Sequence, residues 1–417
     1  MDYLETPATV PVSMNRSLIS LAVGALLLFS ACSEASPGST TSTTVSIPSL
    51  SASSTTSTST TTTIPIPTVS AVVKDAPEEL VTAVEDLYHW IIDPSVGRPD
   101  TSVMSLVEGL ADIETDAMSV DVDGAAHLGV VLETQIAVVV AGDDVLLAVN
   151  DGGWQIVGAR LSRFDAPAIF GDSTRLVFVI GSDARPGEDQ LRLRADSLHI
   201  VATSPADADG AIVGIPRDSW VEASYGGRAK FTNVMASRGP EVVVETAEIL
   251  TGLDFEGYIV TGFKGFVDLV DAFGGFILDI PFAMAEPKSK AYFSAGEQHV
   301  DGADALAFAR NRTIAGGDLT RQLHHGLIMK AALFEAQRRG IEDLPALLEI
   351  LTEHAWTDLT PEALLTLAAS AYELNPVTLT NIVVPGTIGT AGAASVVHLD
   401  DEAQVVFEDL SDGLLNQ

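Results

Sequence analysis

From Arg175 onward, short apolar segments alternate with segments of helical periodicity, and this alternation constrains the fold more than any other feature. The expected strands are 176–180, 197–202, 211–215, 255–260, 276–280 and 378–384. The expected helices are 241–250, 266–273, 303–310, 319–339 and 364–374. Strands that alternate with helices predict a layered α/β fold, with helices on both faces of a mixed sheet.

Residues 73–168 have a different pattern, which predicts a small α+β accessory domain. Apolar residues recur at helical spacing from Leu80 to Ile91, after a helix start at Pro77. The strands expected in this half are 135–140, 145–149 and 154–157. No constellation of catalytic groups occurs in this segment of the sequence, so an accessory or partner-binding role is expected.

The N-terminal segment 1–32 has the features of a signal peptide. An apolar stretch, 18–31, follows Arg16 and is shorter than a membrane span, which needs roughly 20 residues. It ends in small residues before Cys32, an arrangement that resembles a bacterial lipobox with Cys32 as the lipidated residue; Met14 is an alternative start. An uncleaved transmembrane signal anchor is the other interpretation. Both place the remaining chain outside the cytoplasm, at the cell membrane and wall.

Residues 33–72 are expected to form a disordered tether. Most positions from 33 to 70 are Ser or Thr, four others are Pro, and Glu34 carries the single charge. Such a segment buries too little apolar surface to offset the entropy lost on ordering. We expect it to hold the folded part away from the membrane.

The charge distribution excludes some partners and indicates another. The net charge of −35 argues against nucleic acid and against general adhesion to anionic membranes. Residues 175–330, however, contain 15 of the 22 Lys and Arg residues and 21 of the 57 Asp and Glu residues. Basic side chains are therefore concentrated where an anionic ligand could bind. Ordinary Arg–Asp and Arg–Glu pairing is the alternative explanation.

Asp and Arg residues cluster at the ends of the expected strands, where ligands gather in open α/β sheets. The residues at these strand ends are Asp183, Arg185, Arg194, Asp196, Arg217 and Asp218. A later cluster comprises Arg310, Arg312, Asp318 and Arg321. Guanidinium groups bind phosphate oxygens in a bidentate manner, and Asp oxygens suit Mg²⁺. This pattern favours chemistry on a pyrophosphate, although plain salt bridges remain the alternative.

Six ordered motifs between about residues 172 and 400 resemble the LytR-CpsA-Psr family of bacterial cell envelopes. The motifs are GSDAR (181–185), RADSLHIVATSP (194–205), AIVGIPRDSWV (211–221), LTGLDFEGYIVTGFKGFVDLVDAFGGFILDIP (250–281), LAFARNRTIAGGDLTRQ (306–322) and VVPGTIGTAGAASVV (383–397). The resemblance implies an α/β/α sandwich with a central mixed sheet over residues 169–417. It also implies a long apolar cavity for a polyprenyl tail, lined in part by Phe263, Phe266, Val270 and Phe273.

The resemblance implies a phosphotransferase. Its donor would be a polyprenyl-pyrophosphate-linked glycopolymer, and its acceptor a muramic acid hydroxyl of peptidoglycan. A non-catalytic lipoprotein that binds polyprenyl-linked polymers or wall glycans is one alternative. A polyprenyl-pyrophosphate hydrolase is another.

The resemblance also assigns roles to individual residues. Asp183 and Asp196 would ligate Mg²⁺. The residues expected to bind the pyrophosphate are Arg185, Arg194, Arg217, Lys230, Arg310, Arg312, Arg321, Gln322 and His325. The residues expected to act in catalysis are Arg217, Arg310 and Arg312, with Asp218 or Asp318 as alternative general bases.

The sequence departs from the family pattern three and four residues after Arg321. Many members have an Arg-Gln or Asn-Gln pair there, whereas this chain has His324 and His325. An imidazole N–H donates a hydrogen bond to phosphate as an amide N–H does, but we expect the charge of the imidazole to depend on pH.

Overall fold

The computed structural model describes residues 66–171, 174–312 and 316–415, and a six-stranded mixed sheet is its central element. In spatial order the strands are β16 (Trp356–Thr357), β11 (Gly257–Thr261), β6 (Arg175–Ser182), β7 (Ala195–Ser204), β8 (Asp209–Gly214) and β17 (Thr380–Val383). β11 pairs with β6 and β8 with β17 in parallel, whereas the other neighbours are antiparallel. The mixed sheet predicted from the sequence is therefore confirmed.

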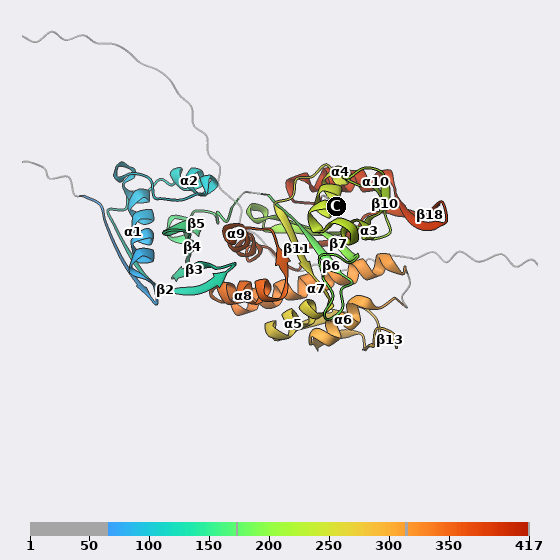
Figure 1. The fold of residues 1–417 in the computed structure, drawn as a ribbon. Coiled ribbons are helices and arrows are strands. Elements are labelled where there is room, and N and C mark those ends of the chain that lie inside the picture. The colour runs from blue at the N-terminus through green and yellow to red at the C-terminus, as the bar shows by residue number, and fades with distance from the viewer. Residues whose placement is uncertain (1–65, 172–173, 313–315, 416–417) are drawn as a thin grey trace, which may run out of the picture. The chain divides into compact units, whose positions relative to one another are not determined.

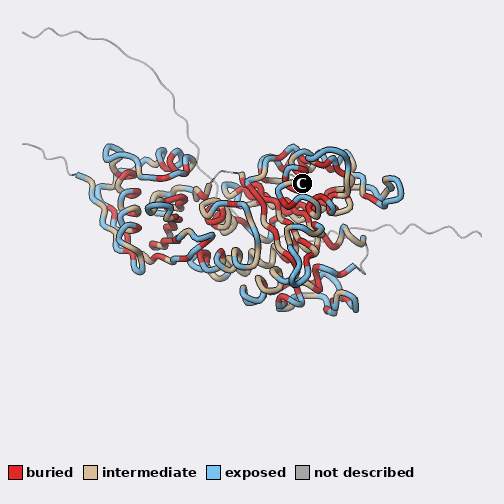
Figure 2. The backbone as a smooth tube through the Cα atoms, in the orientation of Figure 1, coloured by how far each residue is buried: buried red, intermediate tan, exposed pale blue. Residues whose placement is uncertain are grey.

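Helices cover both faces of this sheet (Figure 1). On one face are α3 (Phe231–Arg238), α4 (Pro240–Thr251) and α10 (Asp401–Asp409). On the other are α5 (Phe263–Phe273) and α7 (Asp318–Arg339), and α6 (Gly302–Arg310) packs against these two helices. Because both faces are covered, β6, β7 and β8 are mostly buried, which explains their continuous apolar sequences (Figure 2). The α/β/α sandwich is confirmed.

Glycine residues set the ends of the helices that surround the site. The backbone of Gly274 has a φ of 87°, a left-handed conformation that ends α5 after Phe273, where the helix was expected to end. Gly316 and Gly317, with φ of 82° and 58°, lead into α7. The predicted strand β12 (Phe276–Ile280) forms, but it pairs with β15 (Gly296–Val300) in a separate two-stranded sheet.

A second sheet contains five strands in the order in which they occur in the chain. They are β1 (Thr68–Lys74), β2 (Ser119–Val131), β3 (Thr134–Ala141), β4 (Asp144–Asn150) and β5 (Trp154–Arg160), and α1 (Glu78–Ile92) packs on them. Residues 68–72, assigned to the tether, pair in parallel with β2, so that boundary was wrong. The signal peptide, Cys32 and most of the tether lie outside the described residues. Within the described ranges, no helix is both long and apolar enough to cross a membrane.

The accessory sheet shares its hydrophobic core with two helices from the other end of the chain, α8 (Leu344–His354) and α9 (Pro361–Ala371). The Val130 amide donates to Glu349 Oε1 at 2.6 Å, and Arg160 pairs with Glu373 at 2.6 Å. At position 129 a Cβ atom would lie 2.8 Å from Pro345, so the glycine permits this close approach. The accessory segment therefore packs as part of a continuous structure.

We predict that this shared core makes the accessory and central sheets unfold in one cooperative transition. Ile136→Ala removes a fully buried side chain of β3 and costs about 2–5 kcal/mol, so the whole transition moves to lower temperature. Differential scanning calorimetry measures this, with Val72→Ala on the exposed side of β1 as the control. If the protein instead unfolds in two transitions, and Ile136→Ala lowers the midpoint temperature of only one of them, the shared core would be contradicted.

Candidate functional site

An apolar cavity of about 1050 Å³ lies beside the central sheet, and its walls come from β6, β11, α5, α7, α8 and α9. The four residues that the sequence indicated as lining are all there: Phe263, Phe266, Val270 and Phe273. Further apolar walls come from α7 and α8, for example Met329, Ala332 and Leu348. A cavity of this size with an apolar lining fits a long hydrocarbon chain.

Polar side chains line the same cavity where β6, β7 and the start of α7 come together. They are Ser182, Asp183, Arg185, Asp196, Ser197, Arg310, Arg312, Arg321 and His325. Apart from the two serines, all of them were predicted site residues. The fold thus brings segments that are distant in the chain to one cavity.

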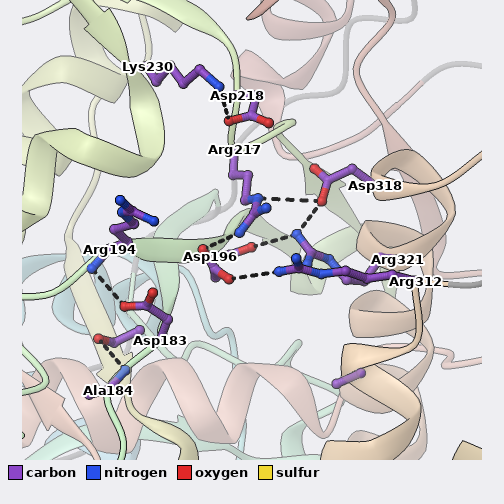
Figure 3. A network of polar contacts seen from close by, with 12 residues as sticks. Asp183, Ala184, Arg194, Asp196, Arg217, Asp218, Lys230, Arg312, Asp318 and Arg321 are labelled. Atoms are coloured by element: carbon purple, nitrogen blue, oxygen red, sulfur yellow. Dashed lines mark hydrogen bonds and ion pairs between the residues drawn. The ribbon is translucent and has the colours of Figure 1, made fainter. Parts of the chain in front are cut away.

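Three guanidinium groups and two carboxylates form one network (Figure 3). Asp196 pairs through Oδ1 with Arg217 at 2.5 Å and through Oδ2 with Arg312 at 3.5 Å. Asp318 pairs with Arg217 at 3.7 Å and accepts a hydrogen bond from Arg321. Three positive charges face two negative ones, so the network carries an excess positive charge.

Burial makes this network electrostatically strong. The side chain of Arg321 is only 4% exposed, and burial is the main cause that lowers the pKa of its guanidinium, while Asp318 opposes that shift. Burial also disfavours the charged form of Arg217, but Asp196 and Asp318 outweigh it and raise its pKa. Guanidinium groups stay charged at neutral pH, and in this site solvent screens the charges of Arg217 and Arg321 little.

The other predicted residues surround this network. Lys230 donates to Asp218 at 3.0 Å, and the Arg194 amide donates to Asp183 Oδ1 at 3.0 Å (Figure 3). The guanidinium of Arg310 lies over the ring of Phe263, 4.5 Å from its centroid, at the cavity wall. Arg310 thus contacts an aromatic ring, whereas Arg217, Arg312 and Arg321 pair with carboxylates.

Two sequence-based expectations require correction. Gln322 was expected to bind the pyrophosphate, but it is fully buried, with its Cβ packed against Gly214. Its amide has no hydrogen-bond partner among the described residues. The charge of His325 was expected to depend on pH, yet burial, His199 and Arg321 hold its pKa well below the ordinary value. His325 is therefore a neutral lining residue at neutral pH.

A hydrogen-bonded array of Ser197, His199 and His325 was not anticipated. Ser197 Oγ lies 3.0 Å from His199 Nδ1 and 2.9 Å from His325 Nδ1. The Nε2 atom of His199 lies 3.1 Å from the Gln322 carbonyl, and that of His325 lies 2.9 Å from the Ala309 carbonyl. The array ties α6 and α7 to β7. Because Ser197 and His325 are distant in the chain, no local motif could reveal it.

The site thus combines an apolar cavity with a cluster of arginines at one side of it. The LytR_cpsA_psr family model matches residues 167–411. The chain belongs to this family, so the resemblance found in the sequence is confirmed.

Individual relatives match shorter stretches. The chain is 33% identical over 197 residues to the probable cell wall biosynthesis protein LcpB of Corynebacterium glutamicum, covering 44% of this chain and 47% of LcpB. It is 30% identical over 189 residues to TagU of Bacillus mycoides, a polyisoprenyl-teichoic acid–peptidoglycan teichoic acid transferase, covering 45% of this chain and 60% of TagU. The chain thus spans about half the length of these relatives.

The crystal structure of B. subtilis TagV has the same fold. Its TM-score is 0.51 at 23% identity, and the match covers 58% of this chain and 98% of the TagV chain. The family model starts after β5 of the accessory sheet.

The buried histidines predict that stability falls with acidification. Burial lowers the pKa of His199 and His324 to about 4, whereas in the unfolded chain their pKa is about 6.5. Between these values the unfolded state binds more protons, so the free energy of unfolding falls by up to about 1.4 kcal/mol per pH unit for each histidine.

Urea unfolding at pH 7, 6 and 5 measures this loss. His324→Phe keeps a ring against Phe308, on which His324 stacks at 4.3 Å, and we expect it to weaken the pH dependence. The exposed His398→Gln variant serves as the control. If the free energy of unfolding changes with pH equally in His324→Phe and in the wild type, the contribution assigned to His324 would be contradicted.

Proposed function

We propose that this protein is a phosphotransferase that moves a polyprenyl-pyrophosphate-linked glycopolymer onto a muramic acid hydroxyl of peptidoglycan. The observation that carries the proposal is an apolar cavity that meets, at one side, an arginine network with excess positive charge. Asp196, Arg312 and Arg321 of this network line the cavity. The cavity suits the polyprenyl chain and the network suits the pyrophosphate, so one donor satisfies both. Membership of the family and the teichoic acid transferase activity for which TagU is named support the proposal.

In the proposed reaction the acceptor hydroxyl oxygen attacks the phosphorus that carries the polymer. A new phosphodiester bond forms, the bond to the bridging pyrophosphate oxygen breaks, and polyprenyl phosphate leaves with the electron pair. Arg217, Arg312 and Arg321 stabilise the charge that develops on the phosphate oxygens. The proton of the hydroxyl passes to a carboxylate.

Two carboxylates lie near enough to the arginines to be candidates for that proton, and their contacts differ. Asp318 is engaged by Arg217 and Arg321, which suits a residue that positions guanidinium groups. Asp218 is 36% exposed, pairs with Lys230 and directly follows Arg217 in the chain. We therefore assign the proton to Asp218 and a positioning role to Asp318.

We also propose a Mg²⁺ ion as cofactor. The carboxylates of Asp183 and Asp196 line the same cavity, and Mg²⁺ commonly binds one or two carboxylates together with substrate phosphates. No cluster of three or more His, Cys, Asp or Glu ligands occurs in the part of the chain that the structure describes, so the substrate and water would complete the coordination. The ion would supply further positive charge to the pyrophosphate.

The family's place in wall assembly and the N-terminal sequence support a location outside the cytoplasm. We propose that Cys32 or the apolar segment before it anchors the chain in the membrane, where the lipid-linked donor resides. The net charge of −35 then keeps the body of the protein from adhering to anionic lipid, while the local arginine network selects the pyrophosphate.

Removal of one network charge tests the proposed reaction. We expect Arg217→Gln to lower polymer transfer by about 10²–10³-fold, because it removes a preorganised donor from a poorly solvated site. Purified protein is incubated with lipid-linked polymer and peptidoglycan oligomers, and the covalent product is quantified. Arg338→Gln, on the exposed end of α7, is the matched control and keeps wild-type transfer.

The same assay separates the alternative functions. A binding lipoprotein would retain the donor without forming a covalent product. A hydrolase would release the polymer phosphate in the absence of any acceptor. Either result with the wild-type protein would overturn the transferase proposal.

Replacement of one proposed ligand tests the metal. We expect Asp183→Asn to raise the Mg²⁺ concentration for half-maximal transfer at least tenfold, because one anionic ligand is lost. Asp189→Asn, an exposed neighbour, is the control. Wild-type transfer that survives exhaustive chelation would contradict the role of the ion.

A further inference from the structure

A second cavity, of about 390 Å³, lies on the face of the sandwich that carries α4 and α10. Its walls come from the two-stranded ribbon of β9 (Trp220–Glu222) and β10 (Arg228–Lys230), from β19 (Ala394–Leu399) and from α10. Figure 1 shows β10, α4, α10 and the hairpin of β18 (Gly386–Ala391) gathered at one end of the molecule. The function proposed above leaves this cavity unused.

The cavity combines an aromatic and apolar floor with polar groups of both signs. Trp220 is half-buried in its wall, and the floor includes Phe407, which is almost fully buried. Asp401 and Gln404 on α10 and Arg228 on β10 surround the floor and are exposed. Carboxylate, amide and guanidinium groups are together able to accept hydrogen bonds from hydroxyls and donate them to carbonyl oxygens.

Contacts within the protein hold parts of this wall in place. Thr387 Oγ1 donates to Asp400 Oδ1 at 3.0 Å, which fixes the first carboxylate of the cavity to the β18 strand. The guanidinium of Arg228 donates to the Trp220 carbonyl at 2.6 Å, across the ribbon. These groups are therefore partly preorganised for a ligand.

The ribbon connects this cavity to the arginine network. Trp220 lies directly opposite Lys230 in the antiparallel pair, and side chains of directly opposed residues share one face. Lys230 on that face donates to Asp218, the proposed proton acceptor. The Asp218 carbonyl accepts from the Val397 amide at 2.9 Å, which joins the ribbon to β19. The cavity and the Asp218–Lys230 pair therefore share one small structural unit.

We propose that this cavity binds a saccharide and, on the basis of the proposed function, that it is the subsite for the acceptor glycan strand. The apolar face of a sugar ring would pack against Trp220, and its hydroxyl and acetamido groups would bind Asp401, Gln404 and Arg228. Adjacent acidic and basic groups disfavour a phosphate ligand, and the exposed polar walls disfavour a lipid. A strand held here extends along the ribbon toward Asp218.

A nuclear magnetic resonance titration of the full chain with chitotetraose tests the binding. The chain has four tryptophans, and the indole N–H resonance that disappears in Trp220→Phe identifies Trp220. We expect chitotetraose to shift this resonance, whereas that of the exposed Trp356 stays in place. No shift at Trp220, or a shift at another indole alone, would overturn the proposal.

Variants give a second readout. We expect Trp220→Ala to weaken chitotetraose binding about tenfold, and Gln404→Ala and Asp401→Ala to weaken it about threefold each. The last two positions are exposed on α10, so their loss of binding does not depend on a core substitution. Trp356→Ala is the matched control and binds as wild type does. Unchanged binding in all three cavity variants would overturn the proposal.

Transfer kinetics distinguish a failure of this site from a failure of the proposed function. We expect Gln404→Ala and Asp401→Ala to raise the KM for peptidoglycan oligomers about threefold and to leave the KM for the lipid-linked donor unchanged. An active wild type whose variants keep the acceptor KM would overturn the subsite alone. A wild type that forms no product overturns the proposed function. Saccharide binding at Trp220 is then decided by the titration with chitotetraose.

Discussion

The structure around the site depends on the burial of Arg321. A guanidinium with only 4% of its side chain exposed is stable only where carboxylates and carbonyls accept the hydrogen bonds that water would otherwise accept. The Asp318 carboxylate is the main acceptor for Arg321. Asp318 also pairs with Arg217, which in turn pairs with Asp196 on β7. The start of α7 is thereby fixed against two strand ends. The arginines repel one another, and this repulsion raises the free energy of the folded state. An anionic ligand would offset the remaining positive charge and so reduce the repulsion when it binds.

Helix α7 joins the charged end of the site to the apolar cavity. Side chains spaced three and four residues apart share one face of a helix, and this face lines the cavity. Its members are Arg321, His325, Ile328, Ala332 and Ala336. Polarity therefore decreases along a single helix, from a guanidinium through a neutral imidazole to alkyl groups. The neutrality of His325 belongs to this gradient, because a charged imidazole there would meet Arg321 and the apolar wall.

The sequence was sufficient to predict what is local. Continuous apolar strands such as β6 and β8, alternating with segments of helical periodicity, indicated the layered fold. The Asp and Arg residues at strand ends indicated the site. Long-range contacts could not be predicted. The burial of Gln322 depends on its packing against Gly214, and the Ser197 array depends on contacts between distant parts of the chain. Residues 68–72 of β1 were assigned to the tether from their composition. Their pairing partner, β2, comes much later in the chain, after α1 and α2 (Met104–Ala111), so no local pattern showed the pairing.

The accessory sheet supports the apolar cavity through α8. Leu344 and Leu348 belong to the core shared with that sheet, and the same residues line the apolar cavity. The Val130 amide and Gly129 hold α8 through Glu349 and Pro345, so the position of one cavity wall depends on β2. The accessory segment thus supports one wall of the cavity in which the lipid is proposed to bind. Because packed interiors tolerate little change in volume, changes in β2 are transmitted to the cavity wall.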